Sequence, residues 1–216
     1  MLERERERVA AASRRLASEG LVLGTAGNIS ERAGDHVAIT PTGAALADLR
    51  ADHVAVVDLD GEHVDGELAA TSELGLHLGV YHRYAAGAVV HAHPPMGTAL
   101  SCVLDELPVV HYQMLSLGGP VRVAPYATFG TPELAELTLE ALSERSAALM
   151  ANHGTITYGP ELDFAVTQSL LLEWACELYW RAATLGRPRA LGPDEQEAVI
   201  DQVARRGYGS TQRVEQ

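Results

Sequence analysis

Two histidines at the end of an apolar segment are the first residues in this chain with an evident capacity for chemistry. His91 and His93 follow the apolar run 88–90 and stand directly before two prolines. Residues two apart in a β-strand point to the same side, so a strand over 88–93 would project both imidazoles together. A bare His-x-His pair also suits a plain polar strand end, and both interpretations stay open at this point.

A third histidine and a carboxylate occupy comparable places. His153 follows the apolar segment 147–152, which we predict to be another strand, and Glu73 follows a Thr-Ser pair in the first turn of a helix predicted over 74–84. Zinc in catalytic sites commonly takes three protein ligands and leaves one position open for substrate. Three histidines with a movable carboxylate fit that requirement. Glu73 equally fits the plain role of a capping or helix-dipole carboxylate.

Three short turns have the composition of an anion site. They cover residues 24–28, 40–43 and 71–72 and are rich in glycine and hydroxyl side chains. Backbone N–H groups in such turns bind anions, and the third turn adds a helix N-terminus. We therefore expect these turns to hold a phosphate, although each of them is also compatible with an ordinary turn. The first turn lacks the G-x-G-x-x-G pattern, which argues against a dinucleotide site.

The chain contains no lysine, and all 16 of its Lys and Arg residues are arginine. A Schiff-base mechanism needs a lysine amine, so class I aldolase and pyridoxal-phosphate chemistry are excluded. A Walker-type phosphate loop is excluded for the same reason. Carbonyl chemistry in this chain must use another electrophile, and a metal ion is the obvious candidate.

Composition narrows the class of protein further. The 216 residues suit one domain, with 207–216 as a polar tail, and a formal charge of −13 disfavours nucleic acid and anionic membranes as partners. No apolar run is long enough to span a bilayer, and the charged N-terminus is unlike a signal peptide. Cys102 and Cys176 give no disulfide framework, which is typical of a cytoplasmic protein.

The elements that must position these residues alternate between helix and strand. We predict strands near residue 29 and over 36–40, 53–59, 88–93, 121–124 and 147–152. Helices are expected over 2–19, 74–84 and 162–185, from a Thr-Pro pair at 131–132, and from 193. This interleaving predicts a single α/β domain, a sheet covered by helices.

At this stage the ordered motifs resemble the class II aldolase/adducin-head superfamily, and within it the bacterial L-fuculose-phosphate aldolase branch. The resemblance covers roughly residues 5–208. Its motifs are GTAGNIS (24–30), ITPTG (39–43), Ser72-Glu73, HAH (91–93), His111-Tyr112, APYATFGT (124–131) and His153-Gly154.

The resemblance implies a mostly antiparallel or mixed sheet with helices on both faces, and one zinc ion per chain. The implied metal ligands are His91, His93, His153 and Glu73, and Glu73 also serves as acid/base. Phosphate binding falls to three pairs, Gly27-Asn28, Thr42-Gly43 and Thr71-Ser72. Tyr112 corresponds to a tyrosine that reaches a neighbouring subunit's site, Tyr208 to one near the aldehyde, and the assembly to a cyclic homotetramer with sites between subunits.

The implied reaction is the reversible retro-aldol cleavage of a ketose 1-phosphate resembling L-fuculose 1-phosphate. Its products are dihydroxyacetone phosphate and a small aldehyde. Within the superfamily the alternatives are a ribulose-phosphate 4-epimerase, a methylthioribulose-phosphate dehydratase and a sugar-acid-phosphate decarboxylase. A non-enzymatic alternative is an adducin-head-like assembly module. Leu74 and Ala92 depart from the pattern, where tryptophan and asparagine are usual, so substrate identity is the least determined property.

Overall fold

The computed structural model describes residues 1–206, so the predicted tail at 207–216 and Tyr208 lie outside the described residues. Within that part the strands form one sheet in the order β4-β3-β2-β1-β5-β9-β8-β7-β6, in which only the β7–β8 pair is parallel. The strands are β1 (Asn28–Ala33), β2 (His36–Ile39), β3 (Ala55–Asp58), β4 (His63–Asp65), β5 (Ala88–Ala92), β6 (Glu106–Leu107), β7 (Val121–Ala124), β8 (Ala147–Met150) and β9 (Gly154–Gly159).

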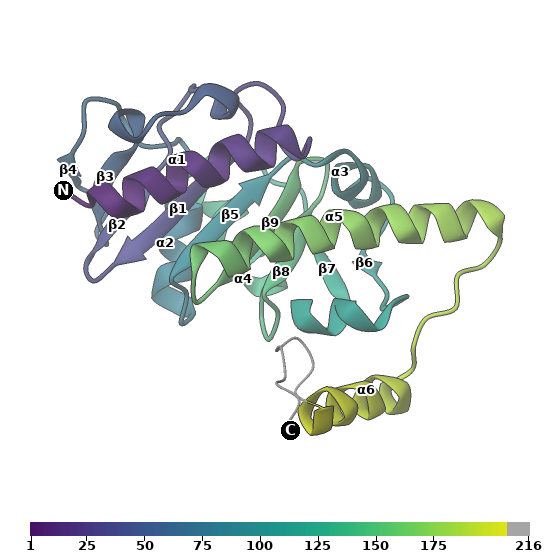
Figure 1. The fold of residues 1–216 in the computed structure, drawn as a ribbon. Helices are drawn as coiled ribbons and strands as arrows, with labels where there is room; N and C mark the ends of the chain where they lie inside the picture. Colours follow the sequence, from purple (N-terminus) through teal and green to yellow (C-terminus); the bar gives the residue numbers. More distant parts are fainter. Residues whose placement is uncertain (207–216) are drawn as a thin grey trace.

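Helices cover both faces of this sheet. In Figure 1, α1 and the long α5 cross the near face, while α2 and α4 lie behind the strands and α6 lies apart below them. The helices are α1 (Glu3–Ser18), α2 (Leu74–Arg83), α3 (Pro95–Ser101), α4 (Pro132–Ala141), α5 (Leu162–Leu185) and α6 (Pro193–Arg206), with 3-10 turns η1 (Leu46–Asp48), η2 (Ala51–His53) and η3 (Tyr112–Leu117). The predicted α/β fold, with a mostly antiparallel sheet covered on both faces, is confirmed.

The central strand β5 separates two hydrophobic cores, and its alternation decides which side chains face which helices. Val89 belongs to the core under α2 and α4, whereas Val90 belongs to the core under α1 and α5. Every residue of β5 is buried. Because side chains alternate along a strand, His91 points to the same face as Val89, which is the face that α2 covers.

Several elements differ from the sequence-based predictions. Residues 51–53 form a 3-10 turn, so the third strand begins at Ala55 and not at His53. The strand predicted over 147–152 ends at Met150, because the chain turns and returns as β9. The sequence analysis did not predict β4, β6, β9, α3 or η3. The N-terminus of α4 is as expected, since the Thr131 side chain accepts the Leu134 N–H at 3.2 Å and Pro132 follows it.

No helix in the described part of the chain is both long and apolar enough to cross a membrane.

Candidate active site

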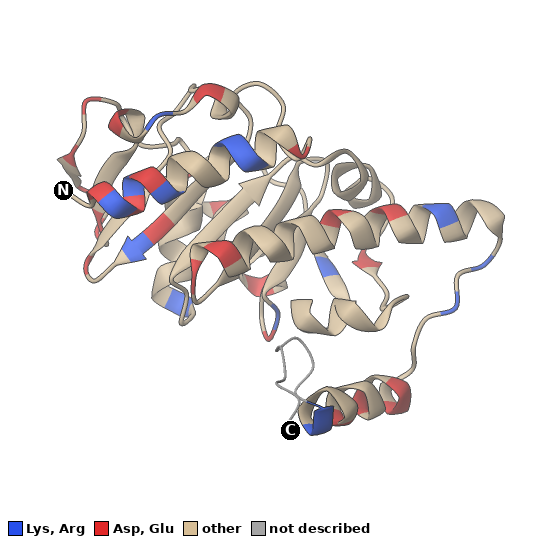
Figure 2. Ribbon diagram, in the orientation of Figure 1, with Lys and Arg blue, Asp and Glu red and all other residues tan. Residues whose placement is uncertain are grey.

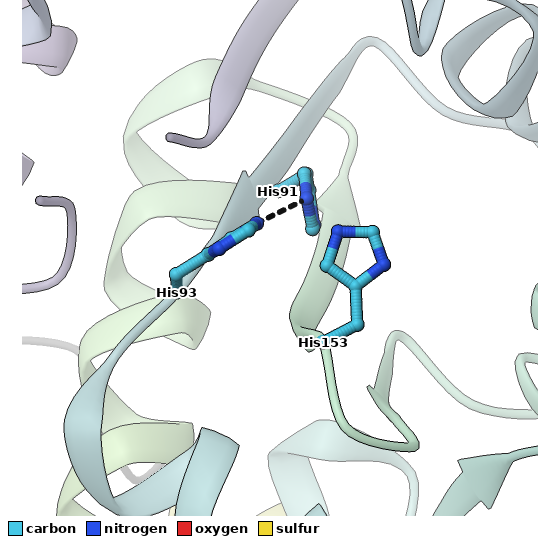
Figure 3. Close-up of side chains that lie close together, drawn as sticks. All are labelled: His91, His93 and His153. Carbon is cyan, nitrogen blue, oxygen red and sulfur yellow. Dashed lines mark hydrogen bonds between the residues drawn. The ribbon is translucent and has the colours of Figure 1, made fainter. Parts of the chain in front are cut away.

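Three histidines from two neighbouring strands meet at one end of the sheet. β5 pairs antiparallel with β9, so the start of β9 lies beside the end of β5, where Ala92 opposes Thr155. His153 directly precedes β9 and is thereby brought next to His91 and His93. The ring centroids of the three imidazoles lie 4.8 to 4.9 Å apart, and Figure 3 shows the rings grouped around one point. We call these three residues the histidine cluster.

The turn between β8 and β9 is built for this approach. Asn152 has a φ of 55°, a left-handed conformation that asparagine tolerates better than most residues. The next residue after His153 is Gly154, where an added Cβ would lie 2.4 Å from the Ala92 carbonyl oxygen. Only glycine therefore lets the two strands approach closely enough for His153 to join the cluster.

The ring nitrogens of His91 and His93 face each other and the Glu73 carboxylate. His91 Nδ1 lies 2.9 Å from the Thr155 carbonyl oxygen. A carbonyl only accepts, so Nδ1 carries the proton and the Nε2 lone pair is exposed. That atom lies 2.9 Å from His93 Nε2 and 3.2 Å from Glu73 Oε2. A ring nitrogen facing a carboxylate at this distance needs a positive charge, which either a proton on that nitrogen or a metal ion supplies.

Glu73 completes the cluster from the first residue before α2. Its Oε1 lies 3.5 Å from His153 Nε2 and is buried without a hydrogen-bond partner among the described residues. Its Oε2 accepts a hydrogen bond from Asn28 Nδ2 at 2.8 Å. The residue occupies the cap position of α2 and makes no side-chain capping bond. The expected placement in the first helical turn is therefore wrong by one residue, and the plain capping role has no hydrogen bond to support it.

The protonation states favour metal binding. Burial lowers the pKa of His93 to about 3 and that of His153 to about 4, and the neighbouring imidazoles act in the same direction. Burial of the Glu73 carboxyl raises its pKa, but the contacts with His91 and Asn28 outweigh this and hold the pKa well below its usual value. Neutral His93 and His153 beside the ionised Glu73 carboxylate are in the form in which such groups bind metals.

The residues fit a divalent metal ion. The three histidine ligand atoms lie within 4.8 Å of one another, and nitrogens bound to one zinc ion at about 2.0–2.1 Å are roughly 3–4 Å apart. The hydrogen bond from His91 Nδ1 to a backbone carbonyl is the outer contact that metal-bound histidines usually make. The buried, unpartnered Glu73 Oε1 is the atom that such an ion would satisfy.

A cleft of about 360 Å³ opens beside the histidine cluster and gathers all three predicted phosphate turns. The second and third turns are tied together, because Thr42 N–H donates to the Ala69 carbonyl and Thr71 N–H donates to the Thr40 carbonyl, each at 3.1 Å. The first turn approaches β5 so closely that a Cβ at Gly27, which has a φ of 89°, would lie 3.0 Å from the His91 carbonyl oxygen. Predicted site residues lining the cleft are Gly27, Asn28, Thr42, Gly43, Thr71, Ser72, Glu73, His93 and His153.

Among residues 1–206, no arginine lines this cleft. The arginines of the described chain lie on helices, on β1 and β7, in the connection between α5 and α6, and in the loops at residues 50 and 145 (Figure 2). An anion in the cleft would be held by backbone N–H groups, amides and hydroxyls. Ser72 and Thr42 are exposed, whereas Thr71 is buried and its Oγ1 accepts the Glu73 N–H at 3.3 Å. Thr71 thus holds the start of α2 in place as well as lining the cleft.

Two predicted residues are not brought to this cleft. Tyr112 begins η3, is 37% exposed and packs its ring 4.6 Å from that of His111, and it is not among the cleft-lining residues of its own chain. Tyr208 lies outside the described residues. Conversely, Tyr126 and Phe129 line the cleft and were not singled out as site residues, although they belong to the motif at 124–131.

Comparisons with known proteins agree with this arrangement. Residues 7–180 match the family model for the Class II Aldolase and Adducin N-terminal domain. The chain is 37% identical over 212 residues to 5-deoxy-D-ribulose 1-phosphate aldolase of Bacillus thuringiensis, covering 97% of this chain and 99% of that one. It is 40% identical to 5-methylthioribulose-1-phosphate/5-deoxyribulose-1-phosphate aldolase of Rhodospirillum rubrum, covering 88% and 86%. A solved structure of L-fuculose 1-phosphate aldolase matches with a TM-score of 0.89 and 32% identity, covering 93% and 96%.

Proposed function

The chain belongs to the class II aldolase and adducin N-terminal domain family and is a metal-dependent sugar-phosphate aldolase, and we propose that it cleaves a ketose 1-phosphate with an apolar end. The products are dihydroxyacetone phosphate and a small aldehyde. The retro-aldol step breaks the bond between C3 and C4, releases the C4 hydroxyl proton and returns a proton to C3, so atoms and charges balance.

One observation carries this proposal, namely that the histidine cluster and the anion-binding turns line the same cleft. We assign zinc as the metal, one ion per chain, because three imidazoles with one carboxylate are a donor set typical of catalytic zinc. When bound, such an ion supplies Lewis-acid stabilisation of the negative charge that develops on the substrate. An assembly module without catalytic function would have no use for this donor set.

Glu73 is the proposed acid/base. Its carboxylate lies at the wall of the cleft and is ionised, and its Oε1 is not tied to any described hydrogen-bond donor. The other oxygen, Oε2, accepts from the Asn28 amide and lies 3.2 Å from His91 Nε2. A carboxylate held on one side can turn toward substrate and exchange the proton at C3, a role that contributes roughly 10²–10⁴-fold to turnover.

The phosphate is proposed to bind at the three turns, through Gly27 and Asn28, Thr42 and Gly43, and Thr71 and Ser72. Tight backbone turns and a helix N-terminus attract an anion without a lysine. Anchoring the phosphate there places the ketose carbons beside Glu73 and the histidine cluster, which is the positioning effect that accelerates bound reactants.

The proton on the C4 oxygen is assigned to Tyr112 of a neighbouring subunit, with Tyr208 as a helper. Tyr112 lies on the surface and outside the cleft of its own chain, so it would serve a site only across an interface. This role requires an oligomer with sites between subunits, and we propose the cyclic homotetramer.

The far end of the substrate is proposed to be a methyl or another apolar group. Tyr126 and Phe129 line the cleft and are 63% and 67% exposed in the chain, so the cleft offers aromatic surface to that end of a ligand. Two relatives that span most of the chain are named for 5-deoxyribulose 1-phosphate. That ketose has a terminal methyl, and its cleavage yields acetaldehyde. L-fuculose 1-phosphate also ends in a methyl and is the second candidate.

A substrate panel tests the proposal. The zinc-loaded protein is given 5-deoxyribulose 1-phosphate, L-fuculose 1-phosphate and ribulose 1-phosphate, and dihydroxyacetone phosphate release is followed with a coupling enzyme. Ribulose 5-phosphate serves as the control for a 4-epimerase. We expect release from the first two at higher kcat/KM than from ribulose 1-phosphate. Epimerisation of ribulose 5-phosphate without release of dihydroxyacetone phosphate from any ketose would overturn the assignment.

A further inference from the structure

Behind the cleft, α2 and β1 enclose a second group of polar side chains. His77 and Tyr81 are one helical turn apart on α2, and Asn28 and Ser30 are two residues apart on β1, so both pairs point across the same gap. All four are buried, with exposures between 0 and 4%. We call them the Tyr81–Asn28 network. Glu73 lies one further turn along the same face of α2.

The hydrogen bonds of this network run in one direction. Ser30 Oγ lies 2.6 Å from Tyr81 OH and 2.7 Å from His77 Nδ1. His77 Nε2 lies 2.5 Å from Asn28 Oδ1, and Asn28 Nδ2 donates to Glu73 Oε2 at 2.8 Å. The ring nitrogens of a neutral histidine are one donor and one acceptor.

Glu73 sets the direction from one end. An ionised carboxylate only accepts, so the Asn28 atom that faces it must be the NH₂ group. The Asn28 oxygen then faces His77 and must accept, which places the proton on His77 Nε2. His77 Nδ1 is left to accept from the Ser30 hydroxyl, and Ser30 in turn accepts from Tyr81. Tyr81, Ser30 and His77 thus each donate to one acceptor. Asn28 donates one N–H to Glu73, and its second N–H is available to a ligand.

We propose that His77 is a positioning residue, which holds the Asn28 amide with its NH₂ group turned toward Glu73 and the cleft. In this orientation Asn28 presents a donor to the substrate's phosphate. The flipped amide would place its oxygen against the Glu73 carboxylate and against the anion. This inference rests on the proposed function for the identity of the anion, but the hydrogen-bond assignment does not depend on it.

Burial supports the assignment of donors and acceptors. It lowers the pKa of His77 to about 3, so the ring stays neutral. It also raises the pKa of Tyr81, so the phenol remains a donor. A protonated His77 would need an acceptor at both ring nitrogens. Neutral His77 needs one, and the Asn28 oxygen supplies it.

Two substitutions at one position separate positioning from packing. A glutamine amide reaches about as far as histidine Nε2, so His77→Gln keeps a donor for Asn28, whereas His77→Asn is too short. With inorganic phosphate as the probe and zinc-loaded protein, calorimetry should show at least roughly tenfold weaker binding in His77→Asn. Binding to His77→Gln should stay within about threefold of wild type. The same substitutions at His82, an exposed histidine of α2, are the controls.

A purely structural His77 would give a different result. Both variants would then lose thermal stability while the folded protein kept its phosphate affinity, and that outcome overturns the proposal. Kinetics add a second readout, since KM for the ketose 1-phosphate should rise in His77→Asn and return toward wild type in His77→Gln.

Nitrogen-15 NMR of the wild-type imidazoles tests the tautomer without any variant. We expect His77 to carry its proton on Nε2, and a proton on Nδ1 would overturn the assignment. If wild type binds phosphate as expected but releases no dihydroxyacetone phosphate from any ketose, the proposed function fails and the positioning role of His77 stands.

Discussion

The histidine cluster and the Tyr81–Asn28 network are neighbouring buried polar groups that differ in how their protons are distributed. In the network, each donor faces an acceptor, from Tyr81 through Ser30 and His77 to Asn28. In the histidine cluster, imidazole nitrogens and a carboxylate lie close together, and Glu73 Oε1 has no hydrogen-bond partner among the described residues. Buried polar groups are normally satisfied. The network therefore leaves only the second N–H of Asn28 for a ligand, whereas the cluster requires a positive charge.

Glu73 belongs to both groups. One oxygen accepts from Asn28 and the other faces His153, so the residue connects a rigid scaffold to a site that depends on a metal. This contrast predicts that substitutions in the cluster affect metal binding and turnover, while substitutions in the network and the turns affect substrate binding and stability.

The largest effect is expected from His91→Ala. Two histidines and one carboxylate remain, and we expect the variant to lose zinc or to bind it far more weakly. Because metal-ion catalysis supplies several kcal/mol, dihydroxyacetone phosphate release should fall by roughly three orders of magnitude or more. Metal content is measured by atomic absorption beside turnover, with His82→Ala as the control. If the variant binds as much zinc as wild type, His91 is not a metal ligand.

Glu73→Gln should separate metal binding from proton transfer. The three histidines remain, so we expect about one zinc per chain to be retained, while kcat falls by roughly 10²–10⁴-fold because the acid/base carboxylate is gone. Glu177→Gln is the matched control, because Glu177 is a half-exposed carboxylate on α5 that pairs with Arg181. If Glu73→Gln turns over within a few-fold of wild type, Glu73 is not the acid/base.

The turns should determine selectivity for phosphate. Thr42→Val and Ser72→Ala each remove a hydroxyl proposed to contact the anion, and a hydrogen bond to a charged group is worth about 1.5–3 kcal/mol, or roughly 10- to 150-fold. We compare kcat/KM for a phosphorylated ketose with that for the unphosphorylated sugar. The ratio should fall in both variants while the zinc content stays unchanged. The control is Thr184→Val, at the exposed end of α5, which should not change the ratio. A constant ratio would place the phosphate elsewhere.

The smallest expected effect is on the pH dependence of stability, through His77. An unfolded histidine has a pKa of about 6.5, and burial lowers that of His77 to about 3. Between these values the unfolded chain binds a proton that the folded chain does not. The free energy of unfolding therefore falls as pH decreases through this window, by up to about 1.4 kcal/mol per pH unit from this group.

Urea unfolding of metal-free wild type and His77→Gln at pH 7, 6 and 5 measures this contribution. The variant should lose less stability between pH 7 and 5 than wild type. Equal losses in the two proteins would mean that His77 is accessible to protons in the folded state.

The sequence predicted the histidine cluster from local signals. An apolar run that ends in His91 and His93 predicted two side chains on one side of a strand, and the second run predicted His153 at another strand end. The strand β9 was not predicted, although the alternating, threonine-containing segment from Gly154 to Gly159 is typical of a strand. The pairing of β5 with β9 is a long-range contact that no local pattern specifies.

The Tyr81–Asn28 network shows what was not predictable. Glu73, His77 and Tyr81 recur at intervals of four and share a helix face, a pattern that the sequence contains and that was not used to predict the site. His77 is completely buried. That this helix face covers Asn28 and Ser30 depends on how α2 packs against the sheet, which the sequence does not specify.

Zinc titration of the metal-free protein tests the central claim most directly. Dihydroxyacetone phosphate release from 5-deoxyribulose 1-phosphate and bound zinc are measured on the same samples as zinc is added. Activity should be absent without metal, rise in proportion to bound zinc and reach its plateau at about one ion per chain. Full activity in protein shown to be metal-free would contradict the account.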